Sequence, residues 1–235
     1  MVTMIIYIKR RDRMFNTPVI TKRNAKYGSN YWYVYSPKLN RMVHLFSNLE
    51  YDHWILIEAN PQIITFCEQP KKVEWLVGEK LLHSIFDMWI ERKDGSQSFI
   101  EIKYQIDLDP QNPRSERPLR QTHLQRKWCE ENNYDYLIQT EKEIRNNPIL
   151  LDNYKEIIPY IQQNRISHND LDQHLVMQKI GKDRITIKQL REDCSHFSPS
   201  RLKQTLYSLI LSGVVEANVD KVALSLTTEV WKNGT

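Results

Sequence analysis

Hydrophobic and polar positions change their period along the chain, which predicts helices that alternate with strands. Ser47 and Glu50 have the S-x-x-E spacing of a helix capping box, and the apolar residues 54–57 follow them. Asn60-Pro61 then ends this predicted helix, because proline cannot continue it.

Short β-rich stretches follow the first predicted helix. Residues 63–67 and 73–77 predict two strands, and 81–91 and 98–104 predict two more. The last two are joined by Lys93-Asp94-Gly95-Ser96. Asp-Gly between β-rich stretches is a strong hairpin signal, so these two strands are expected to pair.

The next segment predicts a return from the hairpin to a further strand. Residues 107–118 contain three prolines and are predicted to be a loop, and 119–132 predict a helix. Residues 134–139 predict a strand, which a crossover would place parallel to the second strand of the hairpin. Residues 141–163 predict one or two helices, interrupted near a proline. This order is that of an α/β/α nuclease core.

A second domain is predicted after a boundary at 164–169. Residues 171–180 predict a helix, and Thr186 and Gln189 are spaced as another capping box. Ser198-Pro199 predicts an N-cap followed by proline at the first helical position.

The helix that begins at Pro199 carries one apolar stripe and is predicted to end at Gly213. Short strands are expected at 214–217 and 222–226. Three helices and a two-stranded wing predict a winged-helix-like domain. The stripe consists of Leu202, Leu206, Leu209 and Ile210. The expected fold class is therefore α/β, a restriction-endonuclease-like α/β/α core at 45–165 followed by a winged-helix-like domain at 166–235.

Composition fits an ordinary globular protein, with 40% hydrophobic and 26% charged residues among 235. No apolar stretch approaches the ~20 residues of a membrane span, and no signal peptide is recognised. The three cysteines are far apart, which favours reduced thiols in a cytoplasm over a disulfide framework.

Charge is concentrated in residues 1–44, which are predicted to form a basic arm with short strands near 31–35 and 42–45. The arm has nine Lys/Arg and one acid, Asp12, so it carries +8 and the rest of the chain −4, given the net charge of +4. Such an arm suits a polyanion, although a solvated arm that aids solubility is the alternative. The predicted DNA-binding residues are Lys9, Arg10, Arg11, Arg13, Lys22, Arg23, Lys26, Lys38 and Arg41.

Three residues of the predicted hairpin form a candidate catalytic group. Glu101 and Lys103 share one strand face, since strand side chains alternate. Asp87 lies among apolar residues, where a carboxylate is costly unless it is paired or metal-bound. The hairpin can bring Asp87 opposite Glu101, which gives a D-x13-E-x-K pattern, and Glu50 of the preceding helix can add a further oxygen ligand.

Phosphodiester hydrolysis explains why these residue types belong together. Asp87, Glu101 and Glu50 offer the oxygen ligands that Mg²⁺ prefers, and Mn²⁺ is expected to substitute for it. A bound ion acidifies water, and Lys103 can position or deprotonate that water and stabilise the charge of the transition state. The alternatives are that Glu50 is only a helix cap and that Glu101 and Lys103 are a solvated strand face. The sequence contains no P-loop, G-x-S-x-G motif or zinc spacing that would compete.

Several segments together resemble the TnsA endonuclease family of heteromeric transposases. The resemblance covers about residues 25–150 by motif and the C-terminal part by layout only. The segments that carry it are Arg41-Met42-Val43-His44, 47–52, Glu58 with Asn60-Pro61, 66–70, Phe86-Asp87, 100–103, Arg126-Lys127-Trp128, 136–138 and 140–144.

This resemblance implies a Mg²⁺-dependent DNA endonuclease that cuts the 5′ strands at transposon ends. It implies work alongside a TnsB-like transposase and a TnsC-like ATPase regulator, the latter through residues 170–231. It also implies that Glu50, Asp87, Glu101 and Lys103 occupy the family's catalytic positions. Two rival hypotheses remain: a stand-alone restriction or repair nuclease, and a winged-helix DNA-binding regulator.

Overall fold

The protein is described here from a computed structural model that places residues 15–19, 30–77, 79–163 and 170–234. Its central sheet has four strands in the order β3-β6-β7-β8. The strands are β3 (Ile63–Glu68), β6 (Met88–Arg92), β7 (Gln97–Ile102) and β8 (Asp135–Gln139). β3, β6 and β7 are antiparallel neighbours, and β8 runs parallel to β7. The predicted hairpin and the predicted parallel crossover are therefore confirmed.

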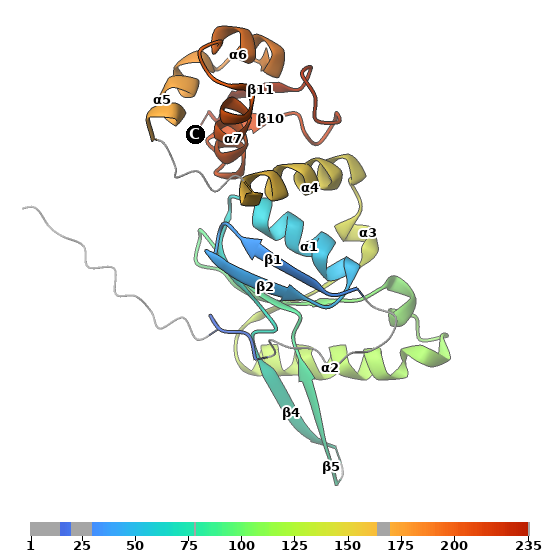
Figure 1. The fold of residues 1–235 in the computed structure, drawn as a ribbon. Helices are drawn as coiled ribbons and strands as arrows, with labels where there is room; N and C mark the ends of the chain where they lie inside the picture. Colours follow the sequence, from blue (N-terminus) through green and yellow to red (C-terminus); the bar gives the residue numbers. More distant parts are fainter. Residues whose placement is uncertain (1–14, 20–29, 78, 164–169, 235) are drawn as a thin grey trace, which may run out of the picture.

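Helices cover both faces of this sheet (Figure 1). Met88 and Ile100 point to one face, where they join a buried cluster with α1 (Asn48–Ala59), α3 (Glu141–Ile144) and α4 (Pro148–Gln163). Trp89 and Phe99 point to the other face and join a second cluster with α2 (Glu116–Glu131). A mixed α/β structure with a mixed sheet of this kind fits the expected restriction-endonuclease-like fold.

The first hairpin, β1 (Trp32–Ser36) and β2 (Arg41–Leu45), packs on α1. Val43 and Leu45 of β2 are fully buried in the same cluster as α1. Residues 30–44, which the sequence analysis placed in an arm, thus contribute side chains to the core because β2 is apolar on its inner face.

The stretch 81–91, expected to be one strand, is divided. β5 (Lys80–Ile85) pairs with β4 (Lys72–Val77), and β6 begins only at Met88. The break faces Gln69, whose φ of 39° is in the left-handed region, and Pro70 follows it. The left-handed backbone and the proline both interrupt a ladder, so β4 and β5 leave the sheet and project as a separate hairpin (Figure 1).

The loop expected at 107–118 contains regular structure. Two short 3₁₀ helices, Gln105–Leu108 and Pro113–Ser115, lead into α2, which begins at Glu116 rather than 119. Pro118 lies in the first turn of α2. It is tolerated there because the first backbone N–H groups of a helix have no intrahelical partner.

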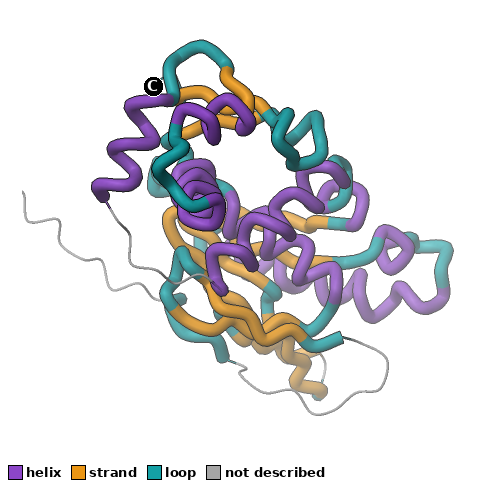
Figure 2. The backbone as a smooth tube through the Cα atoms, turned by 45° about the horizontal axis from the view of Figure 1, so that its top comes forward, coloured by secondary structure: helices purple, strands orange, loops and turns teal. Residues whose placement is uncertain are grey.

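Residues 170–234 form a C-terminal unit at one end of the molecule (Figure 2). The capping box at Thr186 and the cap at Ser198 are both present, and the apolar stripe of the last helix is buried, as predicted. The unit contains the helices α5 (Asp170–Lys179), α6 (Ile187–Asp193) and α7 (Pro199–Leu211) and the strands β9 (Ile185–Thr186), β10 (Val215–Ala217) and β11 (Glu229–Lys232), in the sheet order β10-β11-β9.

The strand predicted at 222–226 is wrong, because these residues are turns and bends. Asn153 of α4 donates to the carbonyls of Val219 and Val222 and accepts from the Leu224 N–H. A buried amide therefore satisfies backbone groups that a strand partner would otherwise satisfy. The second long strand of this sheet forms later, at β11.

Gly213 ends α7 with a φ of 75°, as its predicted C-terminal position requires. A Cβ at this position would lie 2.8 Å from Pro61 Cβ, just after α1. Glycine therefore serves both the turn and the close approach of the C-terminal unit to the α/β core.

His53 gives a testable pH dependence of stability. Burial lowers the pKa of this α1 side chain to about 4, well below its ordinary 6.5. The folded protein therefore keeps His53 neutral while the unfolded chain takes up a proton, so stability falls as pH drops from 6.5 towards 4. We expect this contribution to reach about 3 kcal/mol.

Chemical denaturation of the protein and of His53→Leu at pH 7 and at pH 4.5 measures this contribution. The difference in unfolding free energy between the two pH values should be smaller in the variant. An equal pH dependence in both proteins would contradict the assignment.

Candidate active site

Glu101 and Lys103 lie together at the end of β7. Glu101 is completely buried, and Lys103 Nζ donates to its Oε1 at 2.5 Å. Ile100 and Ile102, which alternate with them, point to the α1 face of the sheet. The predicted placement of Glu101 and Lys103 on one strand face is confirmed.

Asp87 lies in the break between β5 and β6, immediately before β6 begins. Met88 pairs with Ile100, so Asp87 is the next position beside Glu101. Its Oδ2 accepts the Ile102 N–H at 2.7 Å. A backbone amide that would otherwise face the continuing strand thus fixes the carboxylate beside Glu101.

Glu50 reaches this region from the first turn of α1. Ser47 caps the helix by accepting the Glu50 N–H, as predicted, while the Glu50 carboxylate accepts from the Phe46 N–H and the Ser47 hydroxyl. Burial, and then the charge of Asp87, raise the pKa of Glu50. Glu50 therefore takes part in the helix cap, and its carboxylate also interacts electrostatically with Asp87.

The pKa values of Asp87, Glu101 and Lys103 depend on one another. Burial raises the pKa values of Asp87 and Glu101, and the charge of Asp87 raises that of Glu101 further. Burial alone would lower the pKa of Lys103, but Asp87 and Glu101 outweigh it and raise that pKa above its usual range. Lys103 is therefore an ammonium group held by the carboxylates.

Two glutamines of α2 complete the surroundings of Glu101, and neither is among the candidate residues predicted from the sequence. Gln121 Nε2 donates to Glu101 Oε1 at 2.6 Å, and Gln125 Nε2 donates to Glu101 Oε2 at 2.8 Å. Their separation of four residues places them on one helix face, which is the only signal of this pair in the sequence. Gln125 also donates to the Ser84 hydroxyl and accepts from the Tyr136 hydroxyl.

Removing the Gln125 amide should destabilise the protein strongly. Gln125→Leu leaves Glu101 Oε2, the Ser84 hydroxyl and the Tyr136 hydroxyl without this partner, and each unsatisfied buried group costs about 1–3 kcal/mol. We expect the free energy of unfolding to fall by about 4 kcal/mol, as measured by urea denaturation.

Gln121→Leu is the matched control, because Gln121 is partly exposed and makes one hydrogen bond to the same carboxylate. It should cost about 1 kcal/mol. Equal losses in the two variants would show that the three-way network is not what stabilises this region.

The donor set fits a divalent ion held by two carboxylates. Across the described ranges, no three Asp, Glu, His or Cys side chains are grouped closely enough to hold a metal. Mg²⁺, however, keeps several waters and often uses only one or two protein carboxylates. Asp87 and Glu101, which lie side by side, can supply them. The predicted third ligand, Glu50, accepts hydrogen bonds through both oxygens at the helix start, and Glu101 likewise accepts through both of its oxygens.

Comparison with known families matches residues 60–141 to a family model described as TnsA-like endonuclease N terminal. This segment is a TnsA-like endonuclease domain. A search of curated proteins found no match to the chain. The match supports the resemblance to a TnsA-like endonuclease over these residues.

The TnsA-like match contains most of the site. Asp87, Glu101 and Lys103 lie inside residues 60–141, and so do both glutamines of α2. Glu50 lies outside the matched residues. The same domain also includes the projecting β4–β5 hairpin.

Of the predicted DNA-binding residues, only Lys38 and Arg41 lie in the described part of the chain. Lys38 Nζ donates to the carbonyls of Ile57 and Asn60 at the end of α1. Arg41 pairs with the buried Glu68 through both terminal nitrogens, at 2.7 and 2.6 Å. Both side chains hold the fold together, and their contact with DNA stays a prediction. Outside the described residues lie Lys9, Arg10, Arg11, Arg13, Lys22, Arg23 and Lys26.

Proposed function

We propose that this protein is the Mg²⁺-dependent endonuclease subunit of a heteromeric transposase, which hydrolyses the 5′ strands at transposon ends. The contact of Lys103 with the buried Glu101, beside Asp87 and within the TnsA-like domain, carries the proposal. An isolated E-x-K triplet occurs often by chance. A fully buried glutamate with this lysine partner and a neighbouring aspartate is a far more specific arrangement.

Each residue of the site then has a defined task. Asp87 and Glu101 would hold Mg²⁺, or Mn²⁺ in its place, and the ion would acidify water and withdraw charge from the phosphate. Lys103, whose raised pKa keeps it protonated, supplies a fixed positive charge to the developing phosphorane rather than taking a proton. Gln121 and Gln125 hold Glu101 in its orientation. Glu50 remains a proposed further ligand.

The basic arm and the C-terminal unit are assigned to partners. The arm would bind phosphates of the transposon end without reading sequence. The C-terminal unit, which we propose to be winged-helix-like, would contact a TnsC-like regulator through residues 170–231, and a TnsB-like transposase would join the 3′ ends. Three helices with a small antiparallel sheet support this assignment of the C-terminal unit.

We place the protein in the bacterial cytoplasm. Its three cysteines are buried and unpaired, which agrees with a reducing compartment. None of the helices in the described ranges has the length and apolar character needed to cross a bilayer.

Cleavage of transposon-end DNA by the full chain, with and without TnsB-like and TnsC-like proteins and with Mg²⁺ or EDTA, tests the function. We expect Mg²⁺-dependent cutting of 5′ strands that rises strongly when the partners are present. Strong cutting by the chain alone would support a stand-alone restriction or repair nuclease instead. DNA binding without any cutting would favour the winged-helix regulator.

A further inference from the structure

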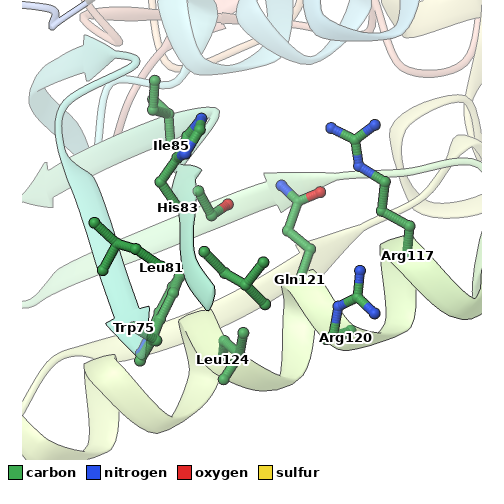
Figure 3. A pocket seen from close by; sticks show the side chains of 10 residues that line it. Trp75, Leu81, His83, Ile85, Arg117, Arg120, Gln121 and Leu124 are labelled. Atoms are coloured by element: carbon green, nitrogen blue, oxygen red, sulfur yellow. The ribbon is translucent and has the colours of Figure 1, made fainter. Parts of the chain in front are cut away.

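A pocket of about 420 Å³ lies between the β4–β5 hairpin and α2 (Figure 3). The hairpin side presents Trp75 and Leu82, which share one face of the hairpin, and the helix side presents Arg117, Arg120 and Gln121. This volume falls in the range of small-ligand sites, so it accommodates one unit of a polymer rather than a duplex.

The pocket adjoins the candidate active site through two side chains. Gln121 lines the pocket, and its amide also donates to Glu101 at 2.6 Å. Ser84 lines the pocket as well, and its hydroxyl accepts from Gln125, which holds the other oxygen of Glu101. A group bound in this pocket would therefore lie next to the reacting phosphate.

The helix wall of the pocket is positively charged. Arg117 is exposed, and no acidic side chain in the described part of the chain pairs with it. Arg120 pairs with Glu116 at 3.3 Å, but Glu116 is 85% exposed, and such surface pairs are weak. Residues 114–127 hold five Lys/Arg against one acid, although the chain outside residues 1–44 has a net charge of −4.

The opposite wall is aromatic and apolar. Trp75 packs on the cluster beneath α2 and is only partly buried, and Leu82, directly across from it on β5, is also partly buried. Cations on one side and ring-bearing or apolar side chains on the other match the two ends of a nucleotide, since phosphates attract arginine and bases stack on aromatic rings.

We propose that this pocket binds one nucleotide of the cut DNA strand, adjacent to the scissile phosphate. Arg117 and Arg120 contact its phosphate, and Trp75 faces its base. The inference rests on the proposed nuclease function and adds the position of the cut strand on the protein surface. The β4–β5 hairpin and α2 are then the two walls that separate this strand from its complement.

A binding assay with a labelled single-stranded 20-nucleotide DNA tests the proposal. Fluorescence anisotropy measures binding by the full chain, in EDTA and at a series of salt concentrations. Arg117→Gln/Arg120→Gln should weaken binding about tenfold. It should also reduce the slope of log K against log salt concentration by about 1.4, since each lost phosphate contact on a single strand contributes about 0.7 to that slope. Arg117→Lys/Arg120→Lys keeps the charge and should keep the slope.

Lys127→Gln/Lys142→Gln removes the same charge from exposed positions outside the pocket and is the matched control. Its slope should change less than half as much. An unchanged slope in the arginine-to-glutamine variant, or an equal change in the control, overturns the proposal. Equal losses for single strands and for blunt duplex also overturn it, because a strand pocket should discriminate between them.

The pocket and the nuclease function are tested separately by these variants. If the arginine variant keeps its slope while Asp87→Ala still abolishes Mg²⁺-dependent cleavage, the pocket is wrong and the nuclease stands. If the slope falls but the protein with its partners never cuts DNA, the pocket binds a strand and the nuclease function is wrong.

Discussion

Alanine in place of Asp87 should reduce Mg²⁺-dependent cleavage of transposon-end DNA by about 1,000-fold or more and leave DNA binding nearly unchanged. Asp87 is one of two adjacent carboxylates that would hold the ion, and loss of metal stabilisation costs several kcal/mol in the transition state. Each 1.36 kcal/mol is a tenfold change in rate. Initial rates of 5′-strand cutting in the presence of the partner proteins give the measurement.

Asp94→Ala is the control for Asp87. Asp94 lies at the turn of the same β6–β7 hairpin, is exposed, and accepts the Ser96 N–H. Its replacement should leave the cleavage rate within about threefold of the unaltered protein, as expected for a surface change far from the chemistry. Undiminished cutting by Asp87→Ala would remove this residue from the site.

Lys103→Met should separate catalysis from metal binding. The methionine keeps the length of the side chain but removes the positive charge, so cleavage should fall about 100- to 10,000-fold. Mn²⁺ should bind at least as tightly as before, because the ammonium group that neutralises Asp87 and Glu101 is gone. Calorimetric titration with Mn²⁺ and cleavage assays on one preparation measure both effects.

Stability provides an independent check on Lys103. Its loss leaves the buried Glu101 without a cation, which should cost about 3 kcal/mol of unfolding free energy in EDTA. Lys142→Met, at an exposed position of α3, should change neither cleavage nor stability appreciably. A Lys103→Met protein that has lost Mn²⁺ binding as well would indicate a collapsed site and contradict the assigned role.

Local patterns were sufficient to predict much of the nuclease core. The Asp-Gly turn predicted the β6–β7 hairpin because it matches strand twist, and alternation predicted that Glu101 and Lys103 share a face. Ser47 and Thr186 predicted helix starts because their hydroxyls satisfy free N–H groups at those starts. These features depend on neighbours within a few residues, so they can be predicted from local sequence.

Other features depend on partners far away in the chain. The break before Asp87 follows from Gln69 and Pro70 on the opposite strand, and a pattern read along 81–91 alone shows only a continuous β-rich stretch. The loop at 218–228 is held by Asn153, about 70 residues earlier. Local sequence spacing does not predict contacts between residues so far apart in the chain.

The sequence by itself determined which residue types are available for metal-dependent hydrolysis and which of them share a strand face, because strand alternation is a local rule. Only the tertiary structure decided that Asp87 sits in a break beside Glu101, that Gln121 and Gln125 grip this glutamate, and that a cationic pocket opens next to it. The physical reason is that burial and the hydrogen bonds of a buried carboxylate are set by whichever elements pack around it, and packing joins elements distant in the chain.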